Sequence, residues 1–452
     1  MSYQVGVDLG TTYSAAARCR DGGPVELVPL GQRARSVPST VYAGPDGAFL
    51  IGEDAERRAL SEPGRVVREF KRRIGDPTPV LVGREPMPAE QLAARFVAKL
   101  LQDVARREGA TPSRVALTHP AGWGQHKLRS LRGALAEHGL GSAVLLSEPQ
   151  AAAVGYANNE RVEAGATVAV YDLGGGTFDA AVVRKTAGGG FELLGTPEGI
   201  DQLGGVDFDE AVFAHVRGAL GSDWGELDPA DPEVLAAVAG LRRECTAAKE
   251  ALSHDTEVLI PVLLPGICTQ VRLGRAEFED MIRPAVAETV AALRRALGSA
   301  GVTAADLGAL LLVGGSSRIP LITQAVSAEF GRSAAVDVDP KGVIASGAAV
   351  VARGSERANA RSAAGPALRA AGPASAAAPA HTPVPPSPRS AAQVPAEVAA
   401  PTLRAVPPAS AAPAAAVEGT GPLRPAPRRR RSPPSGRRPP PRSGRTPRTP
   451  PA

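Results

Sequence analysis

The chain has few of the residues that stabilise small secreted domains or mark membrane proteins. Its 452 residues include three cysteines, Cys19, Cys245 and Cys268, an odd number with no paired spacing and each among apolar neighbours. Disulfide frameworks and zinc sites need paired cysteines, so we expect buried, reduced thiols. No apolar run, including the one around residues 309–313, is long enough to span a bilayer, and no basic leader precedes the first strand-like run. These absences predict a cytoplasmic protein without a transmembrane segment.

Lysine and aspartate are missing from residues 356–452, which hold 15 arginines, 3 glutamates and 23 of the 43 prolines. This segment carries roughly +12 charges, which leaves roughly −7 on residues 1–355 because the whole chain carries +5. With no apolar periodicity and too little aromatic surface to repay ordering, it is predicted to be a disordered tail rich in Pro, Ala and Arg.

The tail has two candidate kinds of partner. Its recurring PxxP spacing suits a groove on a protein partner, and its arginine-rich end could make weak, nonspecific contact with nucleic acid or anionic lipid. A solvated appendage with no defined partner is the alternative.

The remaining 355 residues predict an α/β architecture with an internal repeat. Strand-like and helical segments alternate, and two hairpins with similar sequences, VDLGTTYS from Val7 and YDLGGGTFD from Tyr171, place Asp8 and Asp172 about 164 residues apart. We therefore predict two related lobes, residues 1–165 and 166–340, with a helix over 341–353 closing the first, followed by the tail.

The two hairpin turns have the composition of an anion site. Glycine and threonine let consecutive backbone N–H groups converge on a ligand, which makes an anion cradle. An aspartate beside each cradle suits a cation held against the bound anion, and Mg²⁺ with a polyphosphate meets that requirement. Either turn alone could be purely structural, but together they predict a phosphate clamp between two lobes.

A third glycine element, LLVGGSSRIP over residues 311–320, follows a buried strand and opens a helix. Nucleotides bind at such positions in α/β proteins. A tight connection that needs glycine for a positive φ is the alternative.

Six motifs in order carry a family resemblance. They are DLGTTYS, FKRRIG (residues 70–75), LSEPQAAAVGY (146–156), DLGGGTFD, LGGVDFD (203–209) and LLVGGSSRIP. Over residues 3–353 the chain resembles the ATPase domain of the DnaK-like 70-kDa heat-shock chaperones. The resemblance implies an actin-like (ribonuclease H-like) ATPase, two lobes around a nucleotide cleft. The hairpins alone would also suit actin-like filament proteins or sugar kinases.

The resemblance also implies roles for individual residues. Asp8 and Asp172 would hold Mg²⁺ through its water shell. Phosphate would be cradled by Gly10, Thr11, Thr12 and Tyr13 on the first lobe and by Gly174, Gly175, Gly176 and Thr177 on the second, with Gly204 and Gly205 nearby. The catalytic set would be Lys71, Glu148, Asp172, Thr177 and Asp179, a set suited to phosphoryl transfer.

Two of these assignments have simpler alternatives. Lys71 stands among arginines, so it could belong to a solvated run of charge. Glu148 could be only a first-turn carboxylate stabilised by the helix dipole.

The adenosine end matches the family pattern in part. The matching residues are Lys249, Ser253, Gly314, Gly315, Ser316 and Arg318. Thr246 and Glu250 replace a ribose-binding glutamate and a base-covering arginine, and Lys341 replaces an acidic residue. Adenine specificity is therefore less firmly predicted than phosphate binding. Plain amphipathic packing is the alternative for Lys249.

The resemblance implies a slow Mg-ATPase with ATP and Mg²⁺ as cofactors, a chaperone-like protein without its own peptide-binding domain. An ATP-gated binding scaffold with vestigial hydrolysis is the alternative, favoured by the missing β-sandwich domain and by Leu128 where the family has an interdomain arginine. An actin-like filament protein would instead sediment in a nucleotide-dependent way, and a sugar kinase would need a substrate acid in the cleft.

Overall fold

The computed structural model describes residues 2–20, 23–31, 34–59, 61–160, 162–336 and 340–363. Residues 336, 340–341 and 355–363 are described by their backbone alone. The predicted disorder of the tail therefore lies outside the described residues from residue 364 onward.

A six-stranded sheet forms the centre of the first lobe. It contains β1 (Tyr3–Asp8), β2 (Tyr13–Arg20), β3 (Val25–Leu27), β4 (Ser36–Pro38), β10 (Arg114–His119) and β11 (Val144–Ser147). The order is β11-β10-β1-β2-β3, with β4 also pairing β2. β1 and β2 are antiparallel, whereas β10 is parallel to both β1 and β11.

The second lobe is built on a five-stranded sheet with the same plan. Its strands are β12 (Thr167–Leu173), β13 (Phe178–Lys185), β14 (Phe191–Ile200), β17 (Leu307–Val313) and β18 (Ala335–Val336), in the order β14-β13-β12-β17-β18. β12 and β13 are antiparallel, and β17 is parallel to both β12 and β18. The hairpin repeat in the sequence therefore corresponds to a repeat of sheet topology, as an actin-like fold requires.

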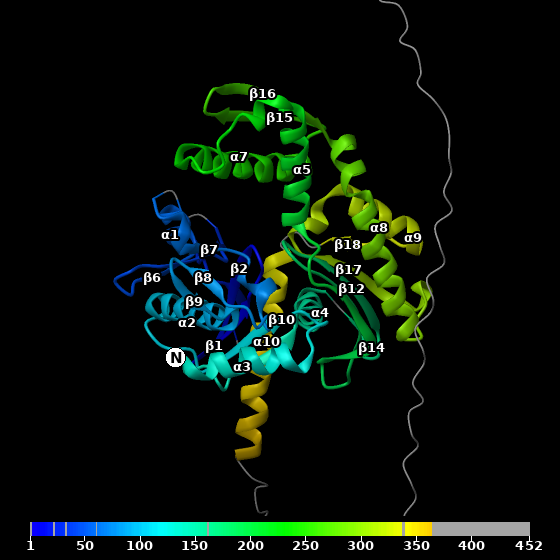
Figure 1. Ribbon diagram of the computed structural model, residues 1–452. Coiled ribbons are helices and arrows are strands. Elements are labelled where there is room, and N and C mark those ends of the chain that lie inside the picture. Colours follow the sequence, from blue (N-terminus) through cyan, green and yellow to red (C-terminus); the bar gives the residue numbers. More distant parts are fainter. Residues whose placement is uncertain are drawn as a thin grey trace, which may run out of the picture. The chain divides into compact units, whose positions relative to one another are not determined.

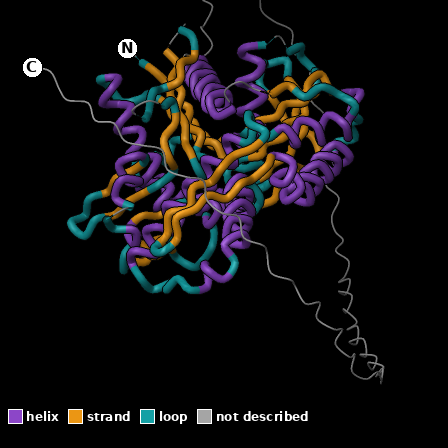
Figure 2. The backbone as a smooth tube through the Cα atoms, turned by 90° about the horizontal axis from the view of Figure 1, so that it is seen from above, coloured by secondary structure: helices purple, strands orange, loops and turns teal. Residues whose placement is uncertain are grey.

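Long helices cover both sheets. They are α2 (Ala89–Glu108), α3 (Gln125–Glu137), α4 (Glu148–Asn159), α8 (Arg275–Ser299), α9 (Pro320–Phe330) and α10 (Pro340–Ala363). Figure 2 shows strands through the middle of the folded part and helices on the outside. Each lobe has its own apolar core, and every residue of β1 and β12 is buried. Burial on both faces explains why these strands read as continuous apolar runs in the sequence.

Helix α10 packs against β1, β2 and β10 and against α4 (Figure 1). Glycines permit this close approach: a Cβ on Gly6 would lie 2.1 Å from the backbone nitrogen of Ala349, and one on Gly347 would lie 1.8 Å from the carbonyl oxygen of Ala151. The sequence predicts this helix over residues 341–353, and α10 continues to Ala363 through a stretch rich in the strong helix formers alanine and arginine.

Smaller elements extend each lobe. The first lobe adds β5 (Val41–Ala43), β6 (Phe49–Ile51), α1 (Glu53–Arg58), η1 (Pro63–Arg65), β7 (Val66–Val67), η2 (Phe70–Arg73), β8 (Val80–Val82) and β9 (Glu85–Met87). The second adds α5 (Gly205–Leu220), α6 (Ser222–Gly225), α7 (Pro232–Ala251), β15 (Glu257–Leu264), β16 (Ile267–Gly274), η3 (Ala304–Asp306) and η4 (Gly315–Arg318). In Figure 1, α7, β15 and β16 lie at the top and α1 to β9 at the left.

Two of the three cysteines are buried, as the sequence predicts, and one is not. All three cysteines are free, and Cys19 and Cys245 are buried as predicted. Cys268 is exposed, contrary to the prediction, because side chains alternate along β16 and place it on the outward face, opposite the exposed Leu263.

In the part of the chain that the structure describes, no helix combines the length and apolarity needed to cross a membrane.

Candidate active site

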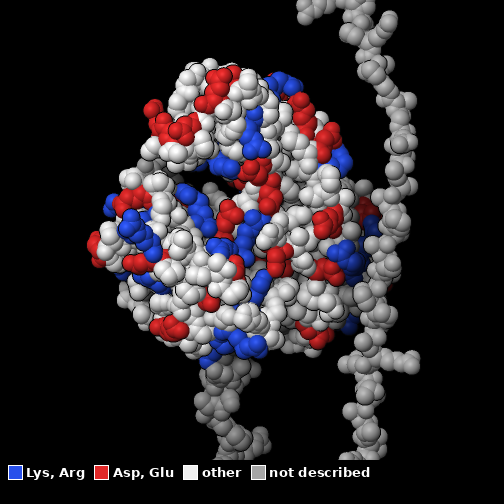
Figure 3. Space-filling model, in the orientation of Figure 1, with Lys and Arg blue, Asp and Glu red and all other residues white. Residues whose placement is uncertain are grey.

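A cavity of about 950 Å³ has walls from both lobes. In Figure 3 a hollow opens between the top and left parts of the molecule, with charged side chains of both signs around it. The predicted site residues that line this cavity are Asp8, Gly10, Thr11, Thr12, Tyr13, Lys71, Glu148, Asp172, Gly174, Gly175, Thr177, Gly205, Lys249, Ser253, Gly314, Gly315, Ser316 and Arg318. The remaining three, Gly176, Asp179 and Gly204, lie directly behind the lining.

Lys71 and Glu148 form an ion pair in this cavity. Lys71 lies in η2 and Glu148 begins α4, and their Nζ and Oε1 atoms are 2.6 Å apart. Burial alone would lower the pKa of Lys71, yet the carboxylates around it, Glu148 first, raise that pKa above its ordinary value. The alternative of a solvated charge run is wrong for Lys71, whose side chain is 4% exposed. Glu148 pairs with this buried ammonium group, so it does more than stabilise the first turn of α4.

Three aspartates surround this ion pair. Asp8 ends β1 and accepts a hydrogen bond of 2.9 Å from the Thr118 hydroxyl. Asp172 stands opposite Asp179 in the register of β12 and β13, and the backbone N–H of Gly122 donates to Asp179 Oδ1 over 3.2 Å. All three aspartates are buried.

The carboxylates outnumber the cations around them. Burial, and then the neighbouring charges of Glu148 and Asp179, raise the pKa of Asp172 well above its ordinary range. Burial and Glu148 raise the pKa of Asp179 to about 8. Four buried carboxylates share Lys71 as their buried ammonium partner, so the charge balance favours a bound cation.

Asp8 and Asp172 both line the cavity and are the carboxylates that could hold a hydrated Mg²⁺, which commonly keeps several of its waters in proteins. Among the described residues, no group of three His, Cys, Asp or Glu side chains is placed to hold a metal ion.

The two hairpin turns face each other across the cavity. A Cβ on Gly175 would lie 2.0 Å from the Thr12 hydroxyl oxygen, and one on Gly176 would lie 2.4 Å from Cγ2 of Thr11. The Thr12 hydroxyl oxygen is buried and has no hydrogen-bond partner among the described residues. A buried hydroxyl without a partner, beside glycine turns that line the cavity, fits a phosphate ligand.

The third glycine element supports the second turn. Gly314 has φ 82°, and a Cβ there would lie 2.6 Å from Asp172 Oδ1, so close packing and backbone conformation both require glycine. The Ser316 hydroxyl donates to the carbonyl of Gly174 over 2.9 Å. This element therefore braces the phosphate turn as well as lining the cavity.

Helix α7 forms the wall expected for adenosine. Lys249 is buried, donates to the Gly205 carbonyl over 3.1 Å and pairs with Asp209 at 2.8 Å, so it does more than pack. Thr246 and Glu250 line the cavity on the same helix. The side chain of Lys341 lies outside the description.

Sequence reasoning missed several residues of the site. Arg35, Asp209 and His254 line the cavity, while Thr118 and Gly122 hydrogen-bond to the buried aspartates. Thr118 lies in β10, which is parallel to β1, so it meets Asp8 at the same edge of the sheet. Arg35 and His254 lie in irregular segments, which give no periodic signal.

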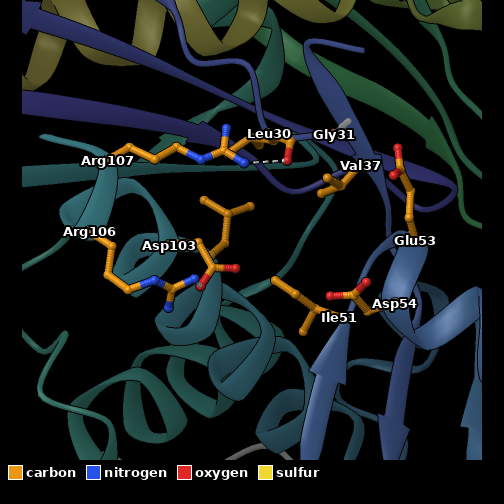
Figure 4. A pocket seen from close by; sticks show the side chains of 10 residues that line it. Leu30, Gly31, Val37, Ile51, Glu53, Asp54, Asp103, Arg106 and Arg107 are labelled. Atoms are coloured by element: carbon orange, nitrogen blue, oxygen red, sulfur yellow. Dashed lines mark hydrogen bonds and ion pairs between the residues drawn. The ribbon is translucent and has the colours of Figure 1, made fainter. Parts of the chain in front are cut away.

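A second cavity, of about 210 Å³, lies in the first lobe between α1 and α2 (Figure 4). Asp103 and Arg106 form an ion pair of 2.7 Å at its wall, and Arg107 donates to the carbonyl of Leu30 over 3.0 Å. It contains none of the predicted site residues.

The fold and the site define an actin-like, two-lobed protein with an anion-binding cleft. Comparison with known proteins narrows this class: the family profile described as "Hsp70 protein" matches residues 4–81 and 78–354. The chain belongs to the Hsp70 family, whose members are ATPases that bind nucleotide with Mg²⁺.

Two relatives show the extent of the similarity. The chain is 34% identical over 379 aligned residues to "Heat shock 70 kDa protein BIP3" of Oryza sativa subsp. japonica, covering 77% of this chain and 56% of the relative. It is 33% identical over 374 residues to "Chaperone protein HscA homolog" of Shewanella denitrificans, covering 77% and 58%. The chain thus spans a little over half the length of these curated relatives.

Proposed function

We propose that this chain binds Mg-ATP in the cleft between its lobes and hydrolyses it slowly, as the ATPase part of a chaperone-like protein of the DnaK class. The observation that carries the proposal is the Lys71–Glu148 ion pair, buried among three aspartates beside two opposed glycine-threonine turns. Such an arrangement suits phosphoryl transfer, which depends on positioning and on charge stabilisation.

Each residue has a role in this proposal. The turns 10–13 and 174–177 bind the β- and γ-phosphates through backbone N–H groups and threonine hydroxyls. Asp8 and Asp172 would hold Mg²⁺ through its water shell, and the bound ion would supply positive charge against the phosphates. Lys71 contacts the γ-phosphate and the attacking water, and Glu148 and Asp179 orient that water.

The adenosine wall departs from the family pattern at Thr246 and Glu250. Lys249, Ser253, Gly314, Gly315, Ser316 and Arg318 would enclose the nucleoside, while Glu250 brings a carboxylate to the cavity. Since Glu250 stands where the family has a base-covering arginine, we expect binding to depend more on the phosphates than on the base.

The domain division is also a proposal. We assign residues 1–165 to the first lobe, with the helix at 341–353 closing it, residues 166–340 to the second, and the remainder to a tail with a protein or polyanion partner. A cytoplasmic location fits the three free cysteines.

The name "chaperone" comes from the relatives, and the chain spans little more than half of each of them. Handling of peptide clients would therefore rest on a partner or on chain beyond the cleft described here. The chemistry of the cleft itself can be tested without a client.

Two measurements on the full chain test the proposal. Equilibrium titration should show ATP binding that weakens when Mg²⁺ is chelated, and a phosphate-release assay should show turnover that also needs Mg²⁺. Binding without release would instead support the ATP-gated scaffold with vestigial hydrolysis. No binding of ATP in the presence of Mg²⁺ would contradict both readings.

A further inference from the structure

Arg72, the residue next to Lys71, connects the first lobe to the phosphate turn of the second. Its Nε donates to the carbonyl of Gly176 over 2.8 Å, and a terminal nitrogen donates to Asp207 Oδ2 over 2.6 Å. The third guanidinium nitrogen contacts Glu69 Oε2 at 3.3 Å. The side chain is 15% exposed and, unlike Lys71, does not line the cavity.

Both second-lobe partners of Arg72 belong to the structure that holds the phosphate turn. Asp207 Oδ2 also accepts the backbone N–H of Gly204 over 2.8 Å, which caps the start of α5. Val206 N–H in turn donates to the carbonyl of Gly175 over 2.8 Å. The turn at 174–177 and the start of α5 therefore form one hydrogen-bonded unit, and Arg72 binds that unit at two points.

The contact with Gly176 orients a single peptide group. In a trans peptide the C=O and the following N–H point in opposite directions. With the Gly176 carbonyl directed at Arg72, the N–H of Thr177 points away from the guanidinium, and Thr177 lines the cavity. A guanidinium can do this because it donates several hydrogen bonds in one fixed plane.

The backbone at Glu69 explains how Lys71 and Arg72, which are adjacent in the sequence, reach different lobes. Glu69 has φ 55°, and among the described residues it is the non-glycine position with positive φ. It begins the short η2 helix in which Lys71 reaches Glu148 and Arg72 reaches the second lobe. A left-handed backbone is unfavourable for a residue with a side chain, so the surrounding contacts must hold it.

We propose that Arg72 is a positioning residue for ATP hydrolysis: it fixes the Gly176–Thr177 peptide and sets the distance between the second-lobe phosphate turn and Lys71. The inference rests on the proposed function. It adds a coupling between lobe closure and chemistry, since both contacts require the two lobes to be together.

The test uses the full chain with Arg72→Met, Arg72→Lys and the matched control Arg73→Met. Arg73 is the next residue, is 40% exposed, and contacts Asp76 and the Thr78 carbonyl, both in the first lobe. Each variant is measured for its single-turnover hydrolysis rate constant with saturating Mg-ATP, for its Kd for Mg-ADP, and for its Tm.

We expect Arg72→Met to lower the rate constant by tenfold or more while the Kd changes by less than threefold. Arg72→Lys should recover only part of the rate, because an ammonium cannot hold both partners in one plane. Arg73→Met should stay within twofold of the parent. Adding Asp207→Asn to Arg72→Met should lower the rate little further, since the two changes remove the same contact.

Other outcomes separate the inference from the proposed function. A parent chain that hydrolyses ATP and an Arg72→Met variant that does so equally fast would overturn the inference alone. Equal losses in Arg72→Met and Arg73→Met, or a loss in proportion to Tm and affinity, would show a merely structural role. If Arg72→Met does not fold, full activity in Arg72→Lys decides against the inference. Absence of hydrolysis in the parent contradicts the proposed function and this inference with it.

Discussion

Lys71 Nζ lies 2.6 Å from Glu148 Oε1, and the two side chains are 4% and 5% exposed. The residues are 77 positions apart in the sequence and come from different elements, η2 and α4. A buried pair of opposite charges is weak evidence for stability, because desolvation offsets the attraction. Both side chains line the same cavity as the two hairpin turns, which gives the pair a better explanation in chemistry than in folding.

Removing one member of this pair should destabilise the nucleotide-free protein. Lys71→Met leaves Glu148 buried beside Asp172 and Asp179, and such an uncompensated charge typically costs about 3–5 kcal/mol. The double variant Lys71→Met with Glu148→Gln should recover more than half of that loss. Urea unfolding followed by circular dichroism measures both. If Lys71→Met alone were as stable as the parent, the buried ion pair would be refuted.

Asp179→Asn should make the nucleotide-free protein more stable at high pH. Burial raises the pKa of Asp179 to about 8, so the folded state binds its proton more tightly than the unfolded state does. This carboxyl group therefore lowers the stability of the parent as the pH rises from about 4 to 8, whereas asparagine does not titrate.

The gain at pH 8 should reach about 5 kcal/mol, with little difference near pH 4, because the pKa of Asp179 rises by about four units, from 3.8 to about 8, and one unit corresponds to about 1.4 kcal/mol. Unfolding free energies of both proteins across this range test the sign. The asparagine variant should also hydrolyse ATP more slowly. Equal pH profiles of stability for the two proteins would contradict the placement of Asp179.

Gly347→Ala should destabilise the fold strongly, because its Cβ would meet the Ala151 carbonyl oxygen of α4 at 1.8 Å. Overpacking of this kind costs about 1–3 kcal/mol or more. Gly218→Ala is the matched control: it lies within α5, a Cβ there meets nothing within 4 Å, and alanine favours a helix by about 0.5–1 kcal/mol. Thermal unfolding should move in opposite directions for the two variants. Similar Tm values would contradict the close crossing of α10 and α4.

One thiol out of three should react quickly with a disulfide reagent at pH 8. Cys268 is exposed, whereas Cys19 and Cys245 are buried, and burial followed by the Asp209 carboxylate raises the pKa of Cys245 to about 12. Cys268→Ser should abolish the fast phase and leave two thiols that react only after denaturation. Two or more thiols that react quickly in the parent would show that Cys19 or Cys245 is accessible to the reagent.

Much of the site could be predicted because many of its residues lie in short motifs whose chemistry can be recognised from neighbouring residues alone. Asp8 and Asp172 could be placed from the sequence because each ends a strand beside a glycine-threonine turn, and the repeated strand order then brings the turns together. Arg72 could not be recognised from its own neighbourhood. It stands in a run of three basic residues, and only the tertiary fold shows that Lys71 is buried, Arg72 crosses to the second lobe and Arg73 faces solvent.

One error arose where the apolar character of neighbouring residues was used to predict burial. Cys268 has apolar neighbours but points outward, since side chains alternate along β16. Helix α10 runs to Ala363, beyond the predicted range of 341–353, because alanine, glutamate and arginine favour a helix.

Single-turnover hydrolysis of labelled ATP by the full chain, compared with Lys71→Ala, tests whether the cleft is an ATPase site. We predict Mg²⁺-dependent phosphate release by the parent and a variant that still binds ATP but is slower by about a hundredfold or more, equivalent to roughly 2.7 kcal/mol of barrier. A variant that hydrolyses ATP as fast as the parent would contradict the role of Lys71. A parent that binds ATP and never releases phosphate would show the cleft to be a nucleotide-gated binding module.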